Sequence, residues 1–169
     1  MALSEIQKQV MEVYIATFNR APDLDGLNYW VDETINNDWT INDVSVSMMQ
    51  SPEAQENFPL DQTNEAFINN IYQNVLGRES DSAGLTYWLE QLDAGIDKTE
   101  MILAIINGAK ADTGSVDDKQ FLDNKKTVAQ YFTFDLQLND VTLAKEAMAL
   151  VTLDTESINT AKDKIDLTK

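Results

Sequence analysis

The chain has 169 residues, 43% of them hydrophobic, which is enough for a core of ordinary size. Twenty-nine acidic and twelve basic residues give a formal net charge of −17. Such a surface repels nucleic-acid phosphates, and the only adjacent basic pair is Lys125–Lys126. The chain lacks cysteine and histidine, which excludes thiol nucleophiles, histidine bases and ordinary zinc sites. We therefore expect no nucleic-acid partner and no enzyme; calcium is the one cofactor left open, because oxygen ligands alone hold it well.

The N-terminal sequence is amphipathic and charged, without the basic region and apolar run of a signal peptide. No stretch is long and apolar enough to span a bilayer, so we expect no direct membrane insertion. If the protein is secreted, its export signal lies elsewhere, for instance in a C-terminal portion beyond these residues.

Hydrophobic residues recur at three- and four-residue steps nearly throughout, which predicts an all-α fold. One helix is expected to end at Phe18 and its counterpart at Gly77, a plausible C-terminal stop. Asp23 and Asp81 stand at the N-cap positions of the helices that follow. We expect these two helices to turn the following residues inward: Leu27, Trp30, Val31 and Ile35 in the first, Leu85, Trp88, Leu89 and Leu92 in the second.

The most informative feature is a duplicated tract. The segment RAPDLDGLNYW at 20–30 recurs as RESDSAGLTYW at 78–88. The shared positions are Arg20/Arg78, Asp23/Asp81, Gly26/Gly84, Leu27/Leu85, Tyr29/Tyr87 and Trp30/Trp88. Duplication predicts two helical repeats of about 58 residues, 1–59 and 60–114. Residues 115–169 have no copy and are expected to form a helical tail or bundle that packs on the repeats or extends from them.

The first interpretation of the tract is structural. The aspartate caps a helix and pairs with the arginine, the glycine permits a close approach, and the tryptophan fills the core. Arg20, Asp23, Gly26 and Trp30 would take these roles in the first repeat, and Arg78, Asp81, Gly84 and Trp88 in the second. None of these roles requires a ligand.

The second interpretation is a calcium loop. Asp23-x-Asp25-Gly26 resembles the opening of an oxygen-rich loop, in which aspartates and a turn-forming glycine surround the ion. The second copy keeps Asp81 but has Ala83 in the place of Asp25. Neither copy has the closing glutamate of an EF-hand, and Arg20 would oppose a cation.

The third interpretation is a carbohydrate site, because aromatic faces pack on the apolar faces of sugar rings and polar groups fix the hydroxyls. Tyr29 and Tyr87 fall about 100° from the inward stripes, on the flank of their helices. Trp39 lies in the polar loop that begins Asn36-Asn37-Asp38 and, like the two tyrosines, is expected to face solvent. The candidate glycan-binding residues are Tyr29, Trp39, Tyr87, Asn28, Asn36 and Asn37.

The tract LGRESDSAGLTYW, with its weaker copy FNRAPDLDGLNYW, resembles the repeats of the DUF4214 family, and phycobilisome linker domains show a distantly similar pattern. The segments FLDNKKTVAQYF and VTLDTESINTAKDKID resemble the tail that follows such repeats in large secreted bacterial proteins. These include Campylobacter-type surface-layer proteins and RTX-like exoproteins exported by type I secretion. In the first copy Phe18 and Asn19 replace the Leu-Gly of the family pattern.

The resemblance implies an N-terminal module of a secreted protein at the outer face of a Gram-negative cell. In surface-layer relatives this region anchors the lattice through lipopolysaccharide O-antigen. The expected function is therefore non-enzymatic anchoring to this glycan, with self-association in a lattice as a further contact. The alternative is a protein–protein module for lattice assembly or for docking the rest of the exoprotein.

Overall fold

The computed structural model describes residues 3–168, and every regular element in this part of the chain is helical. The all-α prediction is confirmed. The helices are α1 (Glu5–Phe18), α2 (Leu24–Asn36), α3 (Ile41–Met49), α4 (Pro52–Asn57), α5 (Asn64–Leu76), α6 (Ser82–Asp93), α7 (Lys98–Lys110), α8 (Val116–Gln130), the π-helical turn η1 (Tyr131–Asp135), α9 (Val141–Ala149) and α10 (Glu156–Thr168).

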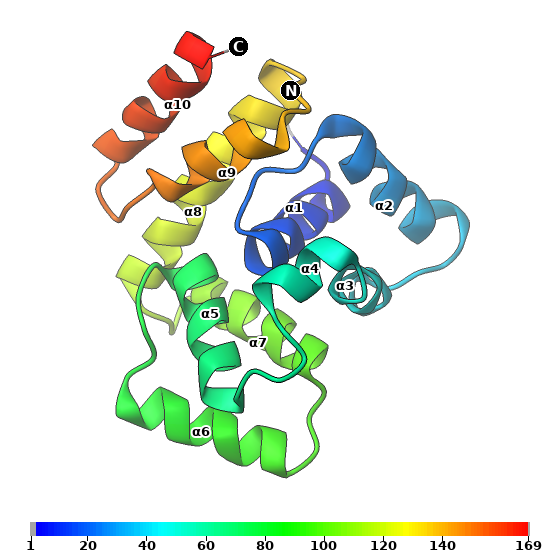
Figure 1. Ribbon diagram of the computed structural model, residues 1–169, viewed down its shortest axis with the longest axis vertical. Coiled ribbons are helices and arrows are strands. Elements are labelled where there is room, and N and C mark those ends of the chain that lie inside the picture. Colours follow the sequence, from blue (N-terminus) through cyan, green and yellow to red (C-terminus); the bar gives the residue numbers. More distant parts are fainter. Residues whose placement is uncertain (1–2, 169) are drawn as a thin grey trace.

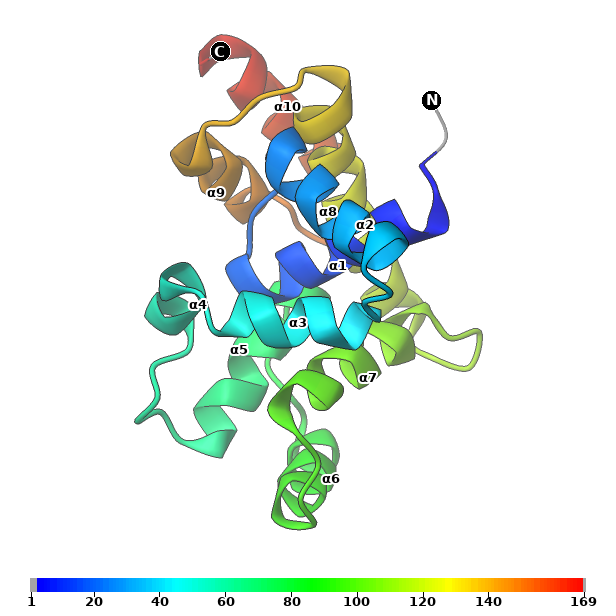
Figure 2. The ribbon, with the colours of Figure 1, turned by 90° about the vertical axis from the view of Figure 1, so that its right-hand side faces the viewer.

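Helix α1 runs through the middle of the molecule (Figures 1 and 2). Every residue from Val10 to Phe18 is buried, and α1 contacts helices of both repeats and α8 of the tail. One hydrophobic cluster joins buried residues of all three segments, for example Val10, Ile71 and Val128. The repeats and the tail therefore share one core.

The predicted helix ends are confirmed at the duplicated tract. Asp23 Oδ1 accepts the amide of Gly26 at 2.7 Å, and Asp81 Oδ1 accepts the amide of Gly84 at the same distance. The preceding helices end on residues in the left-handed conformation, Asn19 in the first repeat and Gly77 in the second. Asparagine is the residue that most readily replaces glycine in this conformation, which explains the departure of the first copy from the Leu-Gly pattern.

The tail is docked on the repeats through polar contacts as well as through the core. Thr133 Oγ1 donates to the carbonyl of Pro22 at 2.6 Å, and Lys145 Nζ lies 3.0 Å from Glu53 Oε1. Lys126 Nζ lies 3.3 Å from the buried carboxylate of Glu12 on α1. These contacts hold α8 and α9 against the first repeat, so the tail packs on the repeats rather than extending as a stalk.

The predicted inward stripes need correction. Trp30 and Trp88 are half-buried and pack at the edge of the core, and Ile35 is 63% exposed. In α6 no residue is fully buried, and Leu89 is half-buried like Trp88. Helical phase predicts the side that a residue occupies, but not whether a neighbouring helix extends far enough to cover it. Helix α6 packs mainly on α5, at the end of the molecule opposite α9 and α10 (Figures 1 and 2).

Candidate functional site

The arginine of the first tract forms an ion pair with a carboxylate of α4, at the end of the first repeat. Arg20 is buried, and its guanidinium makes two hydrogen bonds to the carboxylate of Glu53, at 2.9 and 3.0 Å. Glu53 follows Pro52 in the first turn of α4, where a carboxylate also faces the free amides of the helix. Burial opposes the charge of Glu53, yet its hydrogen bonds to Arg20 and Lys145 hold the pKa of this carboxyl below its usual range.

The second repeat has the same bidentate arginine–carboxylate pair, which we call the arginine clamp, but the carboxylate comes from a residue that is not equivalent to Glu53. Arg78 makes two hydrogen bonds of 2.8 Å to Asp118, in the first turn of α8. In the first repeat, the expected pairing of the arginine with the aspartate of its own tract is present as a longer ion pair beside the main contact with Glu53. Arg20 Nη1 lies 3.8 Å from Asp23 Oδ2, outside hydrogen-bond distance. Arg20 ties its tract to α4 at the end of the first repeat, and Arg78 ties its tract to α8, which follows the second.

In each tract, a tyrosine hydroxyl packs so closely on the glycine that a larger residue would not fit without a shift. A Cβ atom at Gly26 would lie 2.6 Å from the hydroxyl of Tyr14, and one at Gly84 would lie 2.8 Å from the hydroxyl of Tyr72. The predicted close approach is therefore confirmed. Trp88 Nε1 donates to Tyr72 at 3.0 Å. In the first repeat, burial and then the nearby charge of Asp23 raise the pKa of Tyr14 to about 12.

Two of the three aspartates proposed as calcium ligands, Asp23 and Asp81, act as helix caps. The carboxylates of Asp23 and Asp81 accept backbone amides, and Asp25 is exposed on the first turn of α2. Among residues 3–168 no group of three or more carboxylates is placed to hold a metal ion. The geometry supports the capping role of Asp23 and Asp81.

Three aromatic side chains of the first repeat form what we call the aromatic face, defined as Tyr29, Trp30 and Trp39. Tyr29 meets Trp30 edge-on at 4.8 Å between ring centroids, and Trp30 lies 6.2 Å from Trp39. Tyr29 is 52% exposed, while both tryptophans are half-buried. Trp39 is held in the α2–α3 loop, where its amide donates to the carbonyl of Glu33 at 3.3 Å.

The second repeat has only two of these rings. Tyr87 is also 52% exposed and meets Trp88 edge-on at 4.9 Å, but the loop 94–97 after α6 contains no aromatic residue. Helices α2 and α6 occupy different parts of the molecule (Figures 1 and 2). Tyr87 is therefore not brought to the aromatic face.

The predicted asparagines differ in position. Asn36 and Asn37 are exposed at the end of α2, on the loop that carries Trp39, and Asn37 donates to Glu33 Oε2 at 2.8 Å. Asn28 instead lines a separate cavity of about 280 Å³, together with Phe134 of η1. The loop asparagines are placed beside the aromatic face, whereas Asn28 faces the tail.

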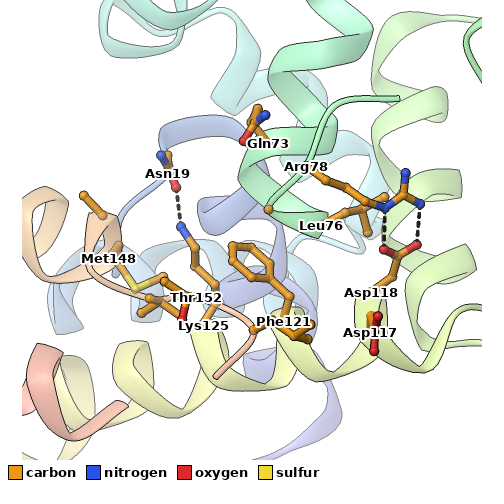
Figure 3. Close-up of a pocket in the computed structure, with 14 residues that line it drawn as sticks. Asn19, Gln73, Leu76, Arg78, Asp117, Asp118, Phe121, Lys125, Met148 and Thr152 are labelled. Atoms are coloured by element: carbon orange, nitrogen blue, oxygen red, sulfur yellow. Dashed lines mark hydrogen bonds and ion pairs between the residues drawn. The ribbon is translucent and has the colours of Figure 1, made fainter. Parts of the chain in front are cut away.

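A larger cavity, of about 450 Å³, lies where the C-terminal end of α5 meets α8 and the loop after α9. We call it the lysine pocket, because Lys125 lies in its wall (Figure 3). Lys125 is 3% exposed, and its Nζ donates to Asn19 Oδ1 at 2.6 Å. Burial lowers the pKa of Lys125 to about 8. Phe121 and the Arg78–Asp118 clamp form further parts of the wall (Figure 3).

The residues that the sequence interpretation missed fall into two groups. Tyr14 and Tyr72 occupy equivalent positions of the two repeats, so the duplication itself could have identified them. Glu53, Asp118 and Lys125 are not equivalent to one another and carry no motif. Only packing brings them to the tract and to the pocket.

The fold and the duplicated clamp define an all-helical repeat module. The sequence matches the domain of unknown function DUF4214 over residues 6–58 and again over residues 45–113. Because the matches cover more than half of the chain, the protein belongs to the DUF4214 family. No curated protein and no solved structure matches it. Within residues 3–168, no helix is long and apolar enough to cross a membrane.

Proposed function

We propose that the protein is a non-enzymatic anchoring module that binds the O-antigen glycan of lipopolysaccharide through the aromatic face. The observation that carries this proposal is the contiguous set of Tyr29, Trp30 and Trp39. The exposed ring of Tyr29 and the half-buried indoles beside it offer apolar surface to sugar rings, and Asn36, on the loop that carries Trp39, can hydrogen-bond to hydroxyls. The setting, a secreted protein at the outer face of a Gram-negative cell, comes from the resemblance to surface-layer and RTX-like proteins.

The net charge of the chain restricts which part of lipopolysaccharide it can approach. A protein with a net charge of −17 is repelled by the phosphates of lipid A and the core oligosaccharide. The outer O-polysaccharide is the part of lipopolysaccharide farthest from these phosphates. Screening shortens the repulsion to about 8 Å at physiological ionic strength, which favours contact with the outer glycan.

The test is retention of the protein on immobilised smooth lipopolysaccharide compared with rough lipopolysaccharide, which lacks O-antigen. We expect retention on the smooth form alone. Tyr29→Ala should weaken it about two- to tenfold, since an aromatic contact contributes about 0.5–1.5 kcal/mol beyond its buried area. Equal retention on both forms, or none on either, would contradict the proposal.

The second repeat supplies a matched control for this test. Tyr87 has the same exposed fraction as Tyr29 and the same edge-on contact with its tryptophan, but it has no third ring beside it. Tyr87→Ala should leave retention unchanged. Equal losses in the two variants would point away from the aromatic face.

A second candidate function is self-association in a lattice, which the packing of α6 favours. Leu85, Leu89 and Leu92 stay half-buried, because α6 is covered mainly by α5. A second copy of the chain could cover this stripe. Sedimentation velocity over a range of concentrations would test it: association abolished by Leu89→Lys supports the lattice contact, and a monomer at all concentrations opposes it.

A further inference from the structure

The lysine pocket contains a buried cation without a protein counter-ion. Lys125 has no carboxylate within ion-pair distance among the described residues, and Asn19 Oδ1 is the one hydrogen-bond acceptor of its Nζ there. An ammonium group has three N–H donors, and burial without acceptors is costly. The next residue, Lys126, is more exposed and yet contacts two carboxylates, Glu12 and Asp123.

The lack of a carboxylate partner sets Lys125 apart from the other buried cation of the described residues. The chain has 29 acidic side chains, and the other buried cation, Arg20, has a full bidentate partner in Glu53. Lys125 donates to Asn19, the residue that ends α1, and the pocket is also lined by Gly77, which ends α5; the carbonyl ends of helices favour a cation nearby. The ammonium group also lies 5.4 Å from the centroid of the Phe121 ring, and two of its N–H donors have no hydrogen-bond acceptor among the described residues.

The walls of the pocket indicate what could supply the missing acceptors. Apolar surface comes from Leu76, Phe121 and Met148, and polar side chains come from Gln73 and Thr152. A volume of about 450 Å³ lies within the ordinary range for small-ligand sites of about 300–1,000 Å³. The pocket therefore suits a ring-sized ligand with an apolar face, hydroxyl groups and an anionic group.

The charges around the pocket favour a monoanion. Apart from Lys125, the charged side chains that line it are Arg78, Asp117 and Asp118, and Arg78 is already paired with Asp118. Helices α1 and α5 and the loop after α9 contribute no charged group. Asp117 and Asp118 would repel a dianionic phosphate more strongly than a singly charged carboxylate.

We propose that the lysine pocket binds the carboxylate of an acidic sugar, a uronic acid residue, with the ammonium group of Lys125 as its counter-ion. This inference rests on the proposed function and adds a second, charge-dependent subsite for the same class of ligand. The carboxylate accepts the free N–H groups of Lys125, Gln73 and Thr152 bond to hydroxyls, and the sugar ring packs on Phe121. The pocket is then separate from the aromatic face, which needs no charge on the glycan.

The test is an NMR titration at pH 7 of the full chain with glucuronic acid, and with glucose as the matched neutral sugar. We expect saturable shifts at the pocket with glucuronic acid and none with glucose. Lys125→Met should weaken binding by at least tenfold, whereas Lys119→Met, an exposed position on the same helix, should not change it. The amide spectra of both variants show whether the fold is kept.

Protonation provides a second readout. Because Lys125 loses its proton near pH 8, the apparent affinity for glucuronic acid should be about 30-fold weaker at pH 9.5 than at pH 7. If Lys125 only stabilised the carbonyl ends of α1 and α5, its deprotonation would not change the affinity for glucuronic acid in this way. The absence of binding at millimolar glucuronic acid, equal binding of glucose, or full binding by Lys125→Met would each overturn the inference. The aromatic face would still stand if smooth lipopolysaccharide remained bound through Tyr29.

Discussion

At the scale of single residues, Lys125 has an environment that opposes its charge. It is 3% exposed, and burial lowers its pKa to about 8 from the usual 10.5. Between these two values the unfolded chain binds more protons than the folded one, so folding stability from this group rises with pH. Below about pH 8 the buried charge costs the folded state about 3 kcal/mol.

This cost predicts that Lys125→Met stabilises the protein. Methionine keeps the length of the side chain and removes the charge, so we expect a gain of about 1–3 kcal/mol at pH 7 after the loss of the hydrogen bond to Asn19. The gain should shrink towards pH 10, where Lys125 is neutral in the wild type. Urea unfolding of both proteins at the two pH values is the measurement. A variant that is less stable at pH 7 would show that the helix ends outweigh burial.

Replacing glycine by alanine at two positions should change the unfolding free energy in opposite directions. Gly26→Ala places a methyl group against the hydroxyl of Tyr14, and we expect a loss of about 1–3 kcal/mol in unfolding free energy. Gly108, within α7, has no atom within 4 Å of an added Cβ, so Gly108→Ala should stabilise by up to about 1 kcal/mol. Thermal unfolding compares them, and similar effects of the two changes would contradict the assigned close approach.

At the scale of helices, the two arginine clamps are the same interaction at different depths. The Arg20 side chain is 7% exposed and that of Arg78 is 42% exposed. Glu53→Gln leaves a buried guanidinium without its bidentate carboxylate, with only the longer contact to Asp23 remaining, and should cost about 2–4 kcal/mol, while Asp118→Asn should cost about 1 kcal/mol. Chemical unfolding at pH 7 tests this order. Equal losses would mean that burial does not set the strength of the clamp.

The first clamp also has a pH dependence with a defined sign. The pKa of Glu53 is lower in the folded protein than its unfolded value of 4.5. Its stabilising contribution is therefore complete above that value and is lost as the pH falls through the folded pKa. The difference in stability between wild type and Glu53→Gln should narrow as the pH falls below 4.5 and through the folded pKa of Glu53.

The sequence predicts local features well and distant partners poorly. Asp23 and Asp81 were identified as caps because capping depends on residues within one turn. The partner of Arg20 lies 33 positions away and that of Arg78 lies 40 positions away, so the spacing does not repeat even though the clamp does. Nothing in a single sequence marks such a pair.

At the scale of the whole molecule, the candidate sites also differ in whether they depend on local sequence or on distant packing. Helical phase predicts the exposed position of Tyr29 on the flank of α2, whereas Trp39, expected to face solvent, is half-buried and packs against the core. The lysine pocket could not be predicted, because it forms only where α5, α8 and the loop after α9 meet. The tail, which has no copy in the repeats, is what completes this second candidate site.

The central claim is that the aromatic face binds O-antigen, and the three tryptophan indoles report on it directly. The measurement is an NMR titration of the full chain with O-polysaccharide released from smooth lipopolysaccharide, following the indole N–H signals. Trp30 and Trp39 lie on the aromatic face, whereas Trp88 belongs to the second repeat and is hydrogen-bonded to Tyr72. We predict saturable shifts of the Trp30 and Trp39 signals with Trp88 unchanged. Three unmoved signals, or a shift confined to Trp88, would contradict the account.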